Sequence, residues 1–150
     1  MDLSSEKLDR ASTIAAVLLS LVGALDSAYL GWLKISGSVA ACSNIGDCEA
    51  VNSSRYAEIA GVPIALLGLL AYLAILALLL IEPRLPNWKE GLRLAFFGFT
   101  LAGTLYSVYL TYIELAVLRA ICPFCVVSAV VMVGLFMIAL YRLRTVTASE

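Results

Sequence analysis

The sequence predicts an all-α membrane protein, a four-transmembrane-helix bundle with an outer loop and a short amphipathic helix over one end. Hydrophobic residues make up 62% of the 150 residues and charged residues only 14%, which is too apolar for a soluble domain. Four apolar runs also reach the roughly 20 residues that a helix needs to cross a hydrocarbon core of about 30 Å. The runs are continuous and rich in Leu and Ala, whereas strands of a membrane barrel alternate over about 10 residues, so we expect helices.

The four spans follow one another along a single domain that covers residues 1–150. They are predicted at residues 12–33, 62–81, 94–113 and 120–141. The alternative for the first run is a signal peptide, with Val39-Ala40-Ala41-Cys42 as a lipoprotein cleavage box. That run is longer than the about 7 to 15 residues of a signal-peptide core and is interrupted by Asp26, so a membrane span is favoured.

Lysine and arginine near the span ends predict the orientation, because cytoplasmic connections carry an excess of positive charge. With the N-terminus inside, seven of them fall on the inner side: Lys7, Arg10, Arg84, Lys89, Arg93, Arg142 and Arg144. Three fall on the outer side: Lys34, Arg55 and Arg119. We therefore expect an integral protein of the cytoplasmic membrane with both termini in the cytoplasm. The 36–60 loop and the 114–119 connection then bring all four cysteines to the outer, oxidising face.

Two of the cysteines form the motif Cys122-Pro123-Phe124-Cys125 at the outer start of the last span. Residues three apart on a helix lie about 5 to 6 Å apart, close enough for a disulfide. Proline suits the first helical turn, which makes Cys122 the expected N-cap. A sulfur there meets unpaired backbone N–H groups, so its thiolate is favoured and its pKa falls. We expect Cys122 to be the exchange-active thiol and Cys125 to face the apolar interior.

The other two cysteines, Cys42 and Cys48, lie in the one sizeable polar loop. Two thiol pairs beside a bilayer indicate a redox relay, in which thiol exchange carries electrons from one pair to the other. A metal site is less favoured, since structural zinc comes with closer paired spacings. A structural disulfide stays open for the loop pair, which such a bond would stabilise outside the cell. The sequence has no Gly-rich phosphate loop and no basic cluster, so we expect no nucleic-acid partner.

Further segments accompany the cysteines. They are Val51-Asn52-Ser53-Ser54-Arg55-Tyr56-Ala57-Glu58, Gly61-Val62-Pro63-Ile64 followed by Gly68, and Tyr112-Ile113-Glu114-Leu115. In this order and spacing, the chain resembles the vitamin K epoxide reductase family of disulfide-generating membrane enzymes over nearly its whole length. The resemblance implies a four-helix bundle around a quinone of the ubiquinone or menaquinone type.

The resemblance also implies a role for each residue of the site. Cys122 and Cys125 become the active pair, Cys42 and Cys48 become the shuttle, and Ser54 matches a loop residue that supports the cysteines by hydrogen bonding. Electrons are expected to pass from a thioredoxin-like or DsbA-like protein dithiol to the shuttle, then to Cys122, and from Cys125 to the quinone. Cys48 is expected to bridge to Cys122, which leaves Cys42 to meet the partner.

The chain departs from the family's pattern at three places. Many bacterial relatives carry a fifth span and a fused thioredoxin-like domain, whereas this sequence ends at Glu150, so we expect a separate partner to deliver electrons. Phe124 stands where prokaryotic members often have tryptophan, which keeps an aromatic face. Ala129 stands where animal enzymes use a tyrosine to hold the substrate head group, so we do not expect vitamin K epoxide as the substrate.

Four aromatic residues and one acid are the candidates for quinone contacts. They are Phe124, Tyr109, Tyr112, Tyr29 and Asp26. These aromatic residues and Tyr106 lie toward the outer halves of the spans, where a quinone head group would lie, although an aromatic belt gives the same pattern. Asp26 is the one charged residue inside the spans, and it is either a proton relay or quinone contact, or a neutral acid that packs between helices. The chain has no histidine, so protons must move through water, tyrosine or this acid.

Arg55 and Glu58 flank Tyr56 on what we predict to be a short amphipathic helix that lies on the lipid surface and caps the quinone pocket. The alternative function is a non-enzymatic four-helix membrane protein, a transport or assembly subunit with structural disulfides. A single ionisable carboxylate inside the spans, Asp26, offers little for transport. We therefore expect a quinone-dependent thiol oxidoreductase that generates disulfides.

Overall fold

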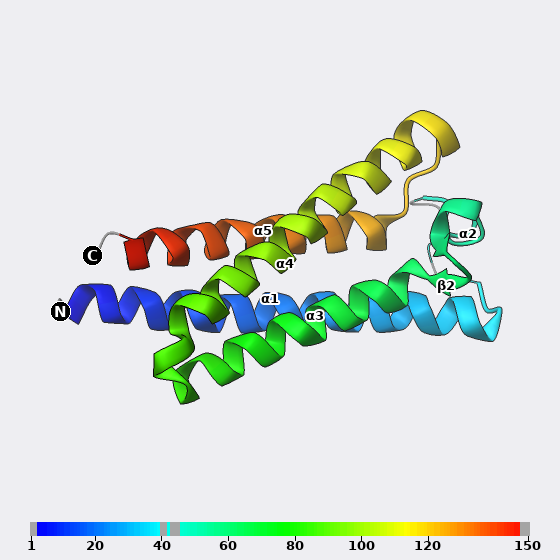
Figure 1. Cartoon of the computed structure of the whole chain (residues 1–150). Helices are drawn as coiled ribbons and strands as arrows, with labels where there is room; N and C mark the ends of the chain where they lie inside the picture. The colour runs from blue at the N-terminus through cyan, green and yellow to red at the C-terminus, as the bar shows by residue number, and fades with distance from the viewer. Residues whose placement is uncertain (1–2, 40–41, 43–45, 148–150) are drawn as a thin grey trace.

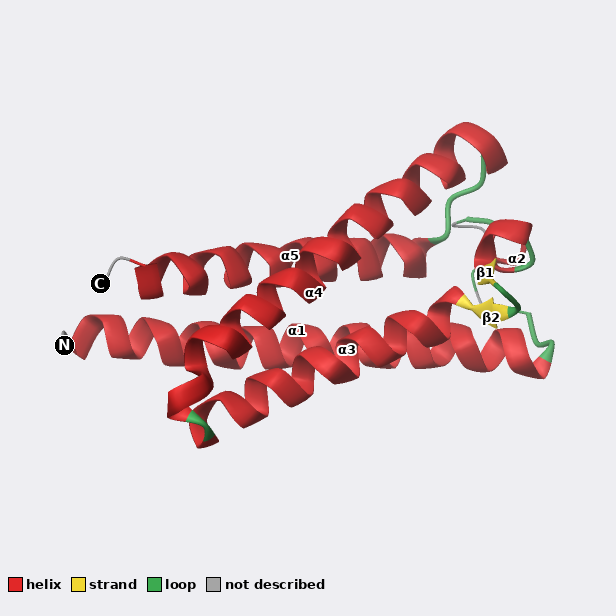
Figure 2. Cartoon of the chain, in the orientation of Figure 1, coloured by secondary structure: helices red, strands yellow, loops and turns green. Residues whose placement is uncertain are grey.

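Four long helices form the body of the protein in the computed structural model, which describes residues 3–39, 42 and 46–147. They are α1 (Leu3–Ser36), α3 (Ile64–Ile81), α4 (Lys89–Tyr112) and α5 (Pro123–Thr147). Each is part of a helical stretch long and apolar enough to cross a membrane. The predicted four-span helical membrane bundle is therefore confirmed, and Figure 2 shows that the only strands in the described chain form one small hairpin.

Shorter elements connect the four helices. They are helix α2 (Cys48–Asn52), the 3-10 turn η1 (Arg55–Ala57), strands β1 (Glu58–Ile59) and β2 (Val62–Pro63), the 3-10 turns η2 (Glu82–Arg84) and η3 (Pro86–Trp88), and the π-helix η4 (Ile113–Leu118). In Figure 1, both termini and the α3–α4 connection lie at one end of the bundle. The hairpin, α2 and the link from η4 to α5 lie at the other end. The two cysteine pairs therefore come from segments that meet at one end.

Helix α1 is longer than the span predicted at residues 12–33, because it begins at Leu3 and ends at Ser36. At about 1.5 Å per residue it is roughly 50 Å long, well beyond a hydrocarbon core of about 30 Å. The apolar run marks only the part of the helix that lipid can cover, and polar residues continue it on both sides. Within the lipoprotein box considered for this region, Ala40 and Ala41 lie outside the described residues.

The helices pack around one core. α1 packs against α3 and α5, while α4 packs mainly against α5 and runs obliquely across the bundle in Figure 1. The core includes Ala16, Tyr72, Ile75, Phe96 and Leu135. Many large apolar side chains instead point outward, with exposed fractions of 72% for Leu25, 63% for Leu70 and 63% for Leu105. Lipid tails are as apolar as these side chains, so their exposure fits a membrane surface.

Tyr72 joins three helices in the middle of the bundle. Its ring fills the space beside Gly23, where a Cβ would collide with the ring, so α1 and α3 approach closely. Its hydroxyl donates to the carbonyl oxygen of Ser128 on α5 at 3.0 Å and lies 2.9 Å from the Ser128 hydroxyl. A buried phenol needs such a partner, which fixes α3 against α5.

Ion pairs join the helices at the end that holds the termini. Arg93 of α4 donates to Glu82 Oε1 at 2.8 Å, and a second nitrogen donates to both carboxylate oxygens of Asp9 on α1, each at 2.8 Å. Arg142 of α5 donates to Glu82 Oε2 at 2.8 Å. Both arginines and Glu82 are buried. Charges that are removed from water need such partners, so this network keeps two buried guanidinium groups neutralised.

The outer loop differs from the amphipathic helix expected around Tyr56. The chain makes only the single turn η1 there, and the next residues pair as an antiparallel hairpin between β1 and β2. Ala60 and Gly61 connect the strands with positive φ angles of 51° and 81°. The helical turn ends at Ala57 because Glu58 is already extended, with φ −136° and ψ 141°, and the left-handed turn then reverses the chain.

Lys34, near the end of α1, holds the loop in place. Its ammonium donates to the carbonyl oxygen of Asn52 at 2.6 Å and pairs with the Glu58 carboxylate at 3.1 Å. These contacts attach both α2 and the hairpin to the outer end of α1. The loop is thereby held over the space between the helices.

Candidate functional site

The sulfur of Cys122 caps the first turn of α5. The chain leaves η4 through Arg119, whose φ of 51° is left-handed, and α5 begins at Pro123. The backbone N–H of Cys125 donates to Cys122 Sγ at 3.4 Å. Proline at the first position lacks an N–H, so the sulfur accepts from the third residue as an N-cap side chain does. The expected N-cap position of Cys122 is confirmed.

This environment favours the Cys122 thiolate. A hydrogen bond from the Cys125 thiol lowers the pKa of the Cys122 thiol below its ordinary value, and the backbone N–H groups of Cys125 and Phe124 act in the same direction. Burial and the nearby Glu114 carboxyl oppose this shift without reversing it. A thiolate is the form that attacks disulfides, so the geometry suits Cys122 for thiol exchange.

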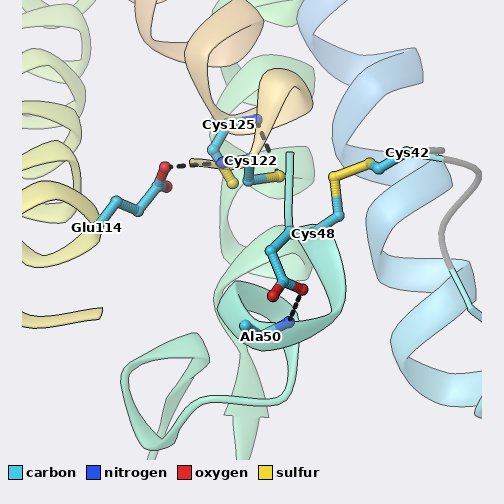
Figure 3. Close-up of a disulfide and its surroundings, with 7 residues drawn as sticks. Cys42, Cys48, Ala50, Glu114, Cys122 and Cys125 are labelled. Atoms are coloured by element: carbon cyan, nitrogen blue, oxygen red, sulfur yellow. Dashed lines mark hydrogen bonds between the residues drawn. A yellow bond between two sulfur atoms is a disulfide. The ribbon is translucent and has the colours of Figure 1, made fainter. Parts of the chain in front are cut away.

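The second cysteine pair lies directly against the first. Cys42 and Cys48 form a disulfide, and both pack in one buried cluster with Cys122. Figure 3 shows the disulfide on one side of Cys122, with Cys125 one turn along α5. Cys48 is 1% exposed and Cys42 is 9% exposed, so Cys48 is the more enclosed member of the pair. The described structure thus holds one oxidised pair next to one reduced pair.

Two backbone features hold the loop disulfide at this position. The N–H of Asp47 donates to the carbonyl oxygen of Ile121 at 3.1 Å, which joins the loop to the segment before α5. Gly46 lies so close to this segment that a Cβ would meet the Ile121 carbonyl and stand 2.9 Å from Pro123 Cδ. Asp47 also starts α2, because its carboxylate accepts the Ala50 N–H at 3.0 Å. Only glycine allows the two segments this approach.

A cavity of about 450 Å³ opens beside the cysteines. All four long helices, α2, η1, β1 and η4 contribute to its wall. Its polar lining includes Cys122, Cys125, Glu114, Asp26, Ser54 and Tyr106. The rest of the wall is mostly apolar, and small-molecule sites of proteins fall in this size range with few polar groups.

The structure separates the residues that the sequence proposed for quinone contacts. Asp26 lies on the cavity wall, and its Oδ2 atom is buried without a hydrogen-bond partner among the described residues. Tyr29 and Phe124 stack with ring centroids 5.1 Å apart, close to the cysteine cluster but not on the cavity wall. Tyr109 and Tyr112 are 48% and 63% exposed and also do not line it.

Tyr106 of α4, another member of the outer aromatic set, does line the cavity. Tyr56 of η1 and Tyr72 of α3, which the sequence did not propose as quinone contacts, also contribute to its wall. Ser54 also lines it, and its hydroxyl donates to the carbonyl oxygen of Val51 at 2.8 Å rather than to a cysteine. This bond stabilises the turn between α2 and η1, which forms the cavity's outer wall.

Glu114 is a site residue that the sequence reasoning missed. Its carboxylate accepts the backbone N–H of Cys122 at 3.2 Å, and its side chain also interacts with the Cys125 thiol. The residue is 6% exposed and lines the cavity. The predicted third span stopped at residue 113, whereas the helix continues as η4 and carries this acid inward. Its position eight residues before Cys122, in the segment Tyr112–Leu115, was the available signal.

Across residues 3–39, 42 and 46–147, no group of three or more histidine, cysteine or acidic residues is arranged to hold a metal ion. The sulfur atoms of Cys42 and Cys48 are bonded to each other. The described side chains beside the cavity include two thiols and two carboxyl groups, next to this disulfide.

Comparison with known proteins agrees with this arrangement. The sequence model described as "Vitamin K epoxide reductase family" matches residues 14–140. A similar relative is "Thiol-disulfide oxidoreductase LTO1" of Arabidopsis thaliana, which is 39% identical over 121 residues. The match covers 77% of this chain and 32% of the relative, so this chain spans about a third of that protein's length. The matched region contains every cysteine and all four long apolar helices, in whole or in large part.

Proposed function

The chain belongs to the vitamin K epoxide reductase family, and on this basis we propose that it is a membrane thiol oxidoreductase that generates disulfides and reduces a quinone. The observation that carries the proposal is the contact of the Cys42–Cys48 disulfide with Cys122 on the wall of a cavity. A relay of two pairs needs this contact, because thiol exchange requires an attacking thiolate to reach a disulfide sulfur.

Each residue has a role in the proposed electron path. A thioredoxin-like or DsbA-like protein dithiol reduces the loop pair, and the more exposed Cys42 is the sulfur it attacks. Cys48 then bridges to Cys122, which is supported by the burial of both residues in one cluster. When this bridge forms, Cys125 is released from the active disulfide as a thiol. Cys42 then attacks Cys48, which restores the loop disulfide and leaves Cys122 and Cys125 as two thiols.

The stoichiometry follows from the chemistry of the two couples. In the direction of electron flow, the reduced loop pair converts the Cys122–Cys125 disulfide into two thiols and becomes a disulfide again. The Cys122–Cys125 dithiol then gives two electrons and two protons to the quinone, which leaves as quinol. The arrangement with an oxidised loop pair and a reduced active pair is the state between these two steps.

The cavity fits a quinone head group in size and in chemistry. Its volume of about 450 Å³ lies in the range of small-molecule sites, and its wall is mostly apolar. The Asp26 Oδ2 atom has no hydrogen-bond partner among the described residues, so it offers a contact for a ligand oxygen. We propose that Asp26 and Tyr106 contact the quinone and that Tyr29 and Phe124 shape the approach to Cys125. Ser54 stabilises the turn between α2 and η1 that forms the outer wall of the cavity.

The proposed orientation places the cysteines outside the cytoplasmic membrane and both termini in the cytoplasm. Seven lysines and arginines against three support it, since cytoplasmic connections are enriched in positive charge. A membrane-impermeant maleimide tests it in a background that lacks the native cysteines. Arg55→Cys should react in intact cells, and Arg84→Cys should react only after the membrane is opened. The reverse pattern would overturn this orientation.

Quinone absorbance provides the test of the activity. Purified protein is mixed with a reduced thioredoxin-like donor and either ubiquinone or menaquinone. We expect turnover by the unmodified protein, none by Cys125→Ser, and near-normal turnover by Ser53→Ala, since Ser53 is an exposed residue of the same loop. A protein that reduces neither quinone would overturn the proposal and favour a structural membrane bundle.

The electron path has its own test. In a variant with Cys42→Ser and Cys125→Ser, the remaining Cys48 and Cys122 should form a disulfide that peptide mass spectrometry identifies. A donor protein that lacks its own resolving cysteine should attack the Cys42–Cys48 disulfide and stay linked to Cys42. A donor linked to Cys122 instead would reverse the proposed order of the pairs.

A further inference from the structure

Oxidation of the active pair by a quinone requires a group that moves protons, and the chain has no histidine to do so. Two thiols release two protons as their sulfur atoms join, and the quinone takes up two as it becomes quinol. A group that serves this exchange must contact a thiol and also face the cavity. Two carboxyl groups line the cavity, Asp26 and Glu114.

Glu114 meets both requirements. Its carboxylate accepts the Cys122 N–H at 3.2 Å and its side chain interacts with the Cys125 thiol. Figure 3 shows it directed at the start of α5, on the side opposite the loop disulfide. It therefore lies next to the pair that reacts with quinone, and away from the pair that reacts with the protein donor.

The backbone holds Glu114 in this position. It belongs to η4, a six-residue π-helix, and its own carbonyl oxygen accepts the Ala120 N–H at 3.1 Å. Wider π turns in helices occur often at functional sites, because they redirect a side chain that an α-helix would aim elsewhere. Here the π-helix brings the Glu114 carboxylate to the N-terminus of α5, although the residue is only 6% exposed.

Asp26 lacks the first requirement. It lies on α1, and the side chain with which its charge interacts is Tyr72 rather than a cysteine. Its free Oδ2 atom suits a contact with the ligand, not the removal of a thiol proton. The two acids therefore have separate tasks at separate places on the wall.

We propose that Glu114 is the proton acceptor for Cys125 and passes this proton to the quinone, an assignment that rests on the proposed quinone-reducing function. Cys122 reacts as a thiolate and Cys125 as a thiol. The two sulfur atoms join and give two electrons to the quinone. The Cys125 proton moves to the Glu114 carboxylate and then to one quinone oxygen. The proton that Cys122 gave to water on becoming a thiolate returns to the second quinone oxygen, so charge and atoms balance.

Other ionisable groups lie on the elements near Glu114, and a pH profile must take them into account. They are Cys122 and Cys125 on α5, Glu49 on α2, Asp47 before it, Tyr106 on α4, Tyr56 on η1 and Arg119 after η4. Glu49, Asp47 and Arg119 are exposed, so water screens them. Glu49 belongs to the helix packed against η4 and supplies a matched control for charge.

The test compares Glu114→Gln, Glu114→Asp and Glu49→Gln in two single-turnover reactions of the chemically reduced enzyme. One reaction uses a quinone and the other uses diamide, a small thiol oxidant that needs no quinone site. Glutamine keeps an oxygen for the Cys122 N–H but cannot carry the proton. We expect Glu114→Gln to slow both reactions about 100-fold, which is the usual contribution of one general base. The pH profile should flatten. The quinone concentration that gives half of the maximal rate should change by less than about 2-fold.

The remaining variants separate this role from a structural one. Glu114→Asp should restore part of the rate, Glu49→Gln should match the unmodified enzyme, and reduction of the loop disulfide by the donor should be unchanged in all three. Wild-type rates and an unchanged pH profile in Glu114→Gln would overturn the assignment, as would an equal loss of loop reduction. Failure of the unmodified enzyme to reduce quinone would overturn the proposed function instead, while the diamide reaction would still decide the role of Glu114.

Discussion

Cys122 shows how one residue position determines the reactivity of a thiol. It is buried among apolar neighbours, which alone would disfavour its thiolate. Hydrogen bonds from Cys125 outweigh this burial and lower the pKa of Cys122. The two cysteines of the motif are therefore not equivalent, and the N-terminal one is the nucleophile at lower pH.

This inequality can be measured in a variant that lacks the loop pair, with Cys42→Ser and Cys48→Ser. The absorbance of thiolate at 240 nm should rise at a lower pH than for an ordinary thiol with a pKa of about 8.5. Adding Cys125→Ala removes the hydrogen bond that contributes most, so the pKa of Cys122 should increase. Adding Cys125→Ser instead keeps a hydroxyl donor and should increase it less. If Cys122 titrates identically with Cys125 present and in Cys125→Ala, the hydrogen bond from Cys125 is not what lowers its pKa.

Asp26 gives the second prediction at this scale. Replacing it by leucine removes the buried oxygen that lines the cavity, and the loss of one hydrogen bond to the ligand should raise the quinone KM about 10-fold. Asp26→Asn keeps a hydrogen-bonding group of the same shape and should raise KM less. Steady-state kinetics with one quinone check both. If Asn and Leu lower kcat equally, an ionisable acid is needed and Asp26 is a relay rather than a contact.

Thiol spacing and an acid in an apolar run pointed to the cysteines and Asp26 without coordinates, and the family resemblance added Ser54. In the structure, Cys122, Cys125, Ser54 and Asp26 line one cavity. Sequence reasoning did not identify which side of α4 faces the cavity. Both sides of this helix are apolar, one for lipid and one for ligand, so periodicity does not distinguish Tyr106 from Tyr109. Only the packing of α4 against α5 makes that choice.

At the scale of elements, the four helices were predictable because each apolar run is as long as a membrane is thick. The π-helix η4 was not, because its wide turn depends on tertiary contacts. The Glu114 side chain binds the N-terminus of α5, and its carbonyl binds the chain between the two helices. Likewise, the turn at Ala60 and Gly61 replaced the expected amphipathic helix with a hairpin.

The docking of the outer loop on α5 is testable through Gly46. In Gly46→Ala, the new methyl group would meet the Ile121 carbonyl and the Pro123 ring, so the loop must move away. A displacement of about 1 Å between reacting atoms can cost 100-fold, and we expect exchange between the two pairs to slow by roughly 10- to 100-fold. Stopped-flow oxidation of the reduced loop by the Cys122–Cys125 disulfide measures this rate.

The matched control for this substitution is Gly91→Ala on α4, where an added Cβ has no neighbour within 4 Å. Its exchange rate should equal that of the unmodified protein. Quinone reduction by the chemically reduced active pair should stay normal in both variants, since neither glycine lines the cavity. Slow quinone reduction in Gly46→Ala would mean that the loop shapes the cavity as well as the relay.

At the scale of the whole molecule, the bundle has a reactive end and a charged end. The four cysteines and the part of the cavity that they border lie at one end. At the other end, ion pairs join α1, η2, α4 and α5 through Asp9, Glu82, Arg93 and Arg142. Counting charges near span ends predicted that both arginines lie there. It did not predict their pairing, because the partners are 84, 11 and 60 positions apart in the sequence.

The charged end should determine stability without affecting catalysis, and Glu82 is the residue to test. Glu82→Gln keeps the shape of the side chain but leaves two buried guanidinium groups with Asp9 as the remaining acid of the network. Removal of one partner from a buried ion pair costs about 3 to 5 kcal/mol, so we expect a loss of this order in the free energy of unfolding. Unfolding in detergent micelles, followed by circular dichroism, measures it.

Two variants show whether burial is the cause. Glu90→Gln changes an exposed acid in the first turn of α4 and should alter the free energy of unfolding by less than about 1 kcal/mol. Asp9→Asn should cost less than Glu82→Gln, because Asp9 is 34% exposed and water can solvate part of the network after its loss. Quinone reduction per folded molecule should stay unchanged in all three, since none of these residues lines the cavity. Equal stability of Glu82→Gln and Glu90→Gln would show that the ion pairs contribute nothing, and that apolar packing alone holds this end of the four helices together.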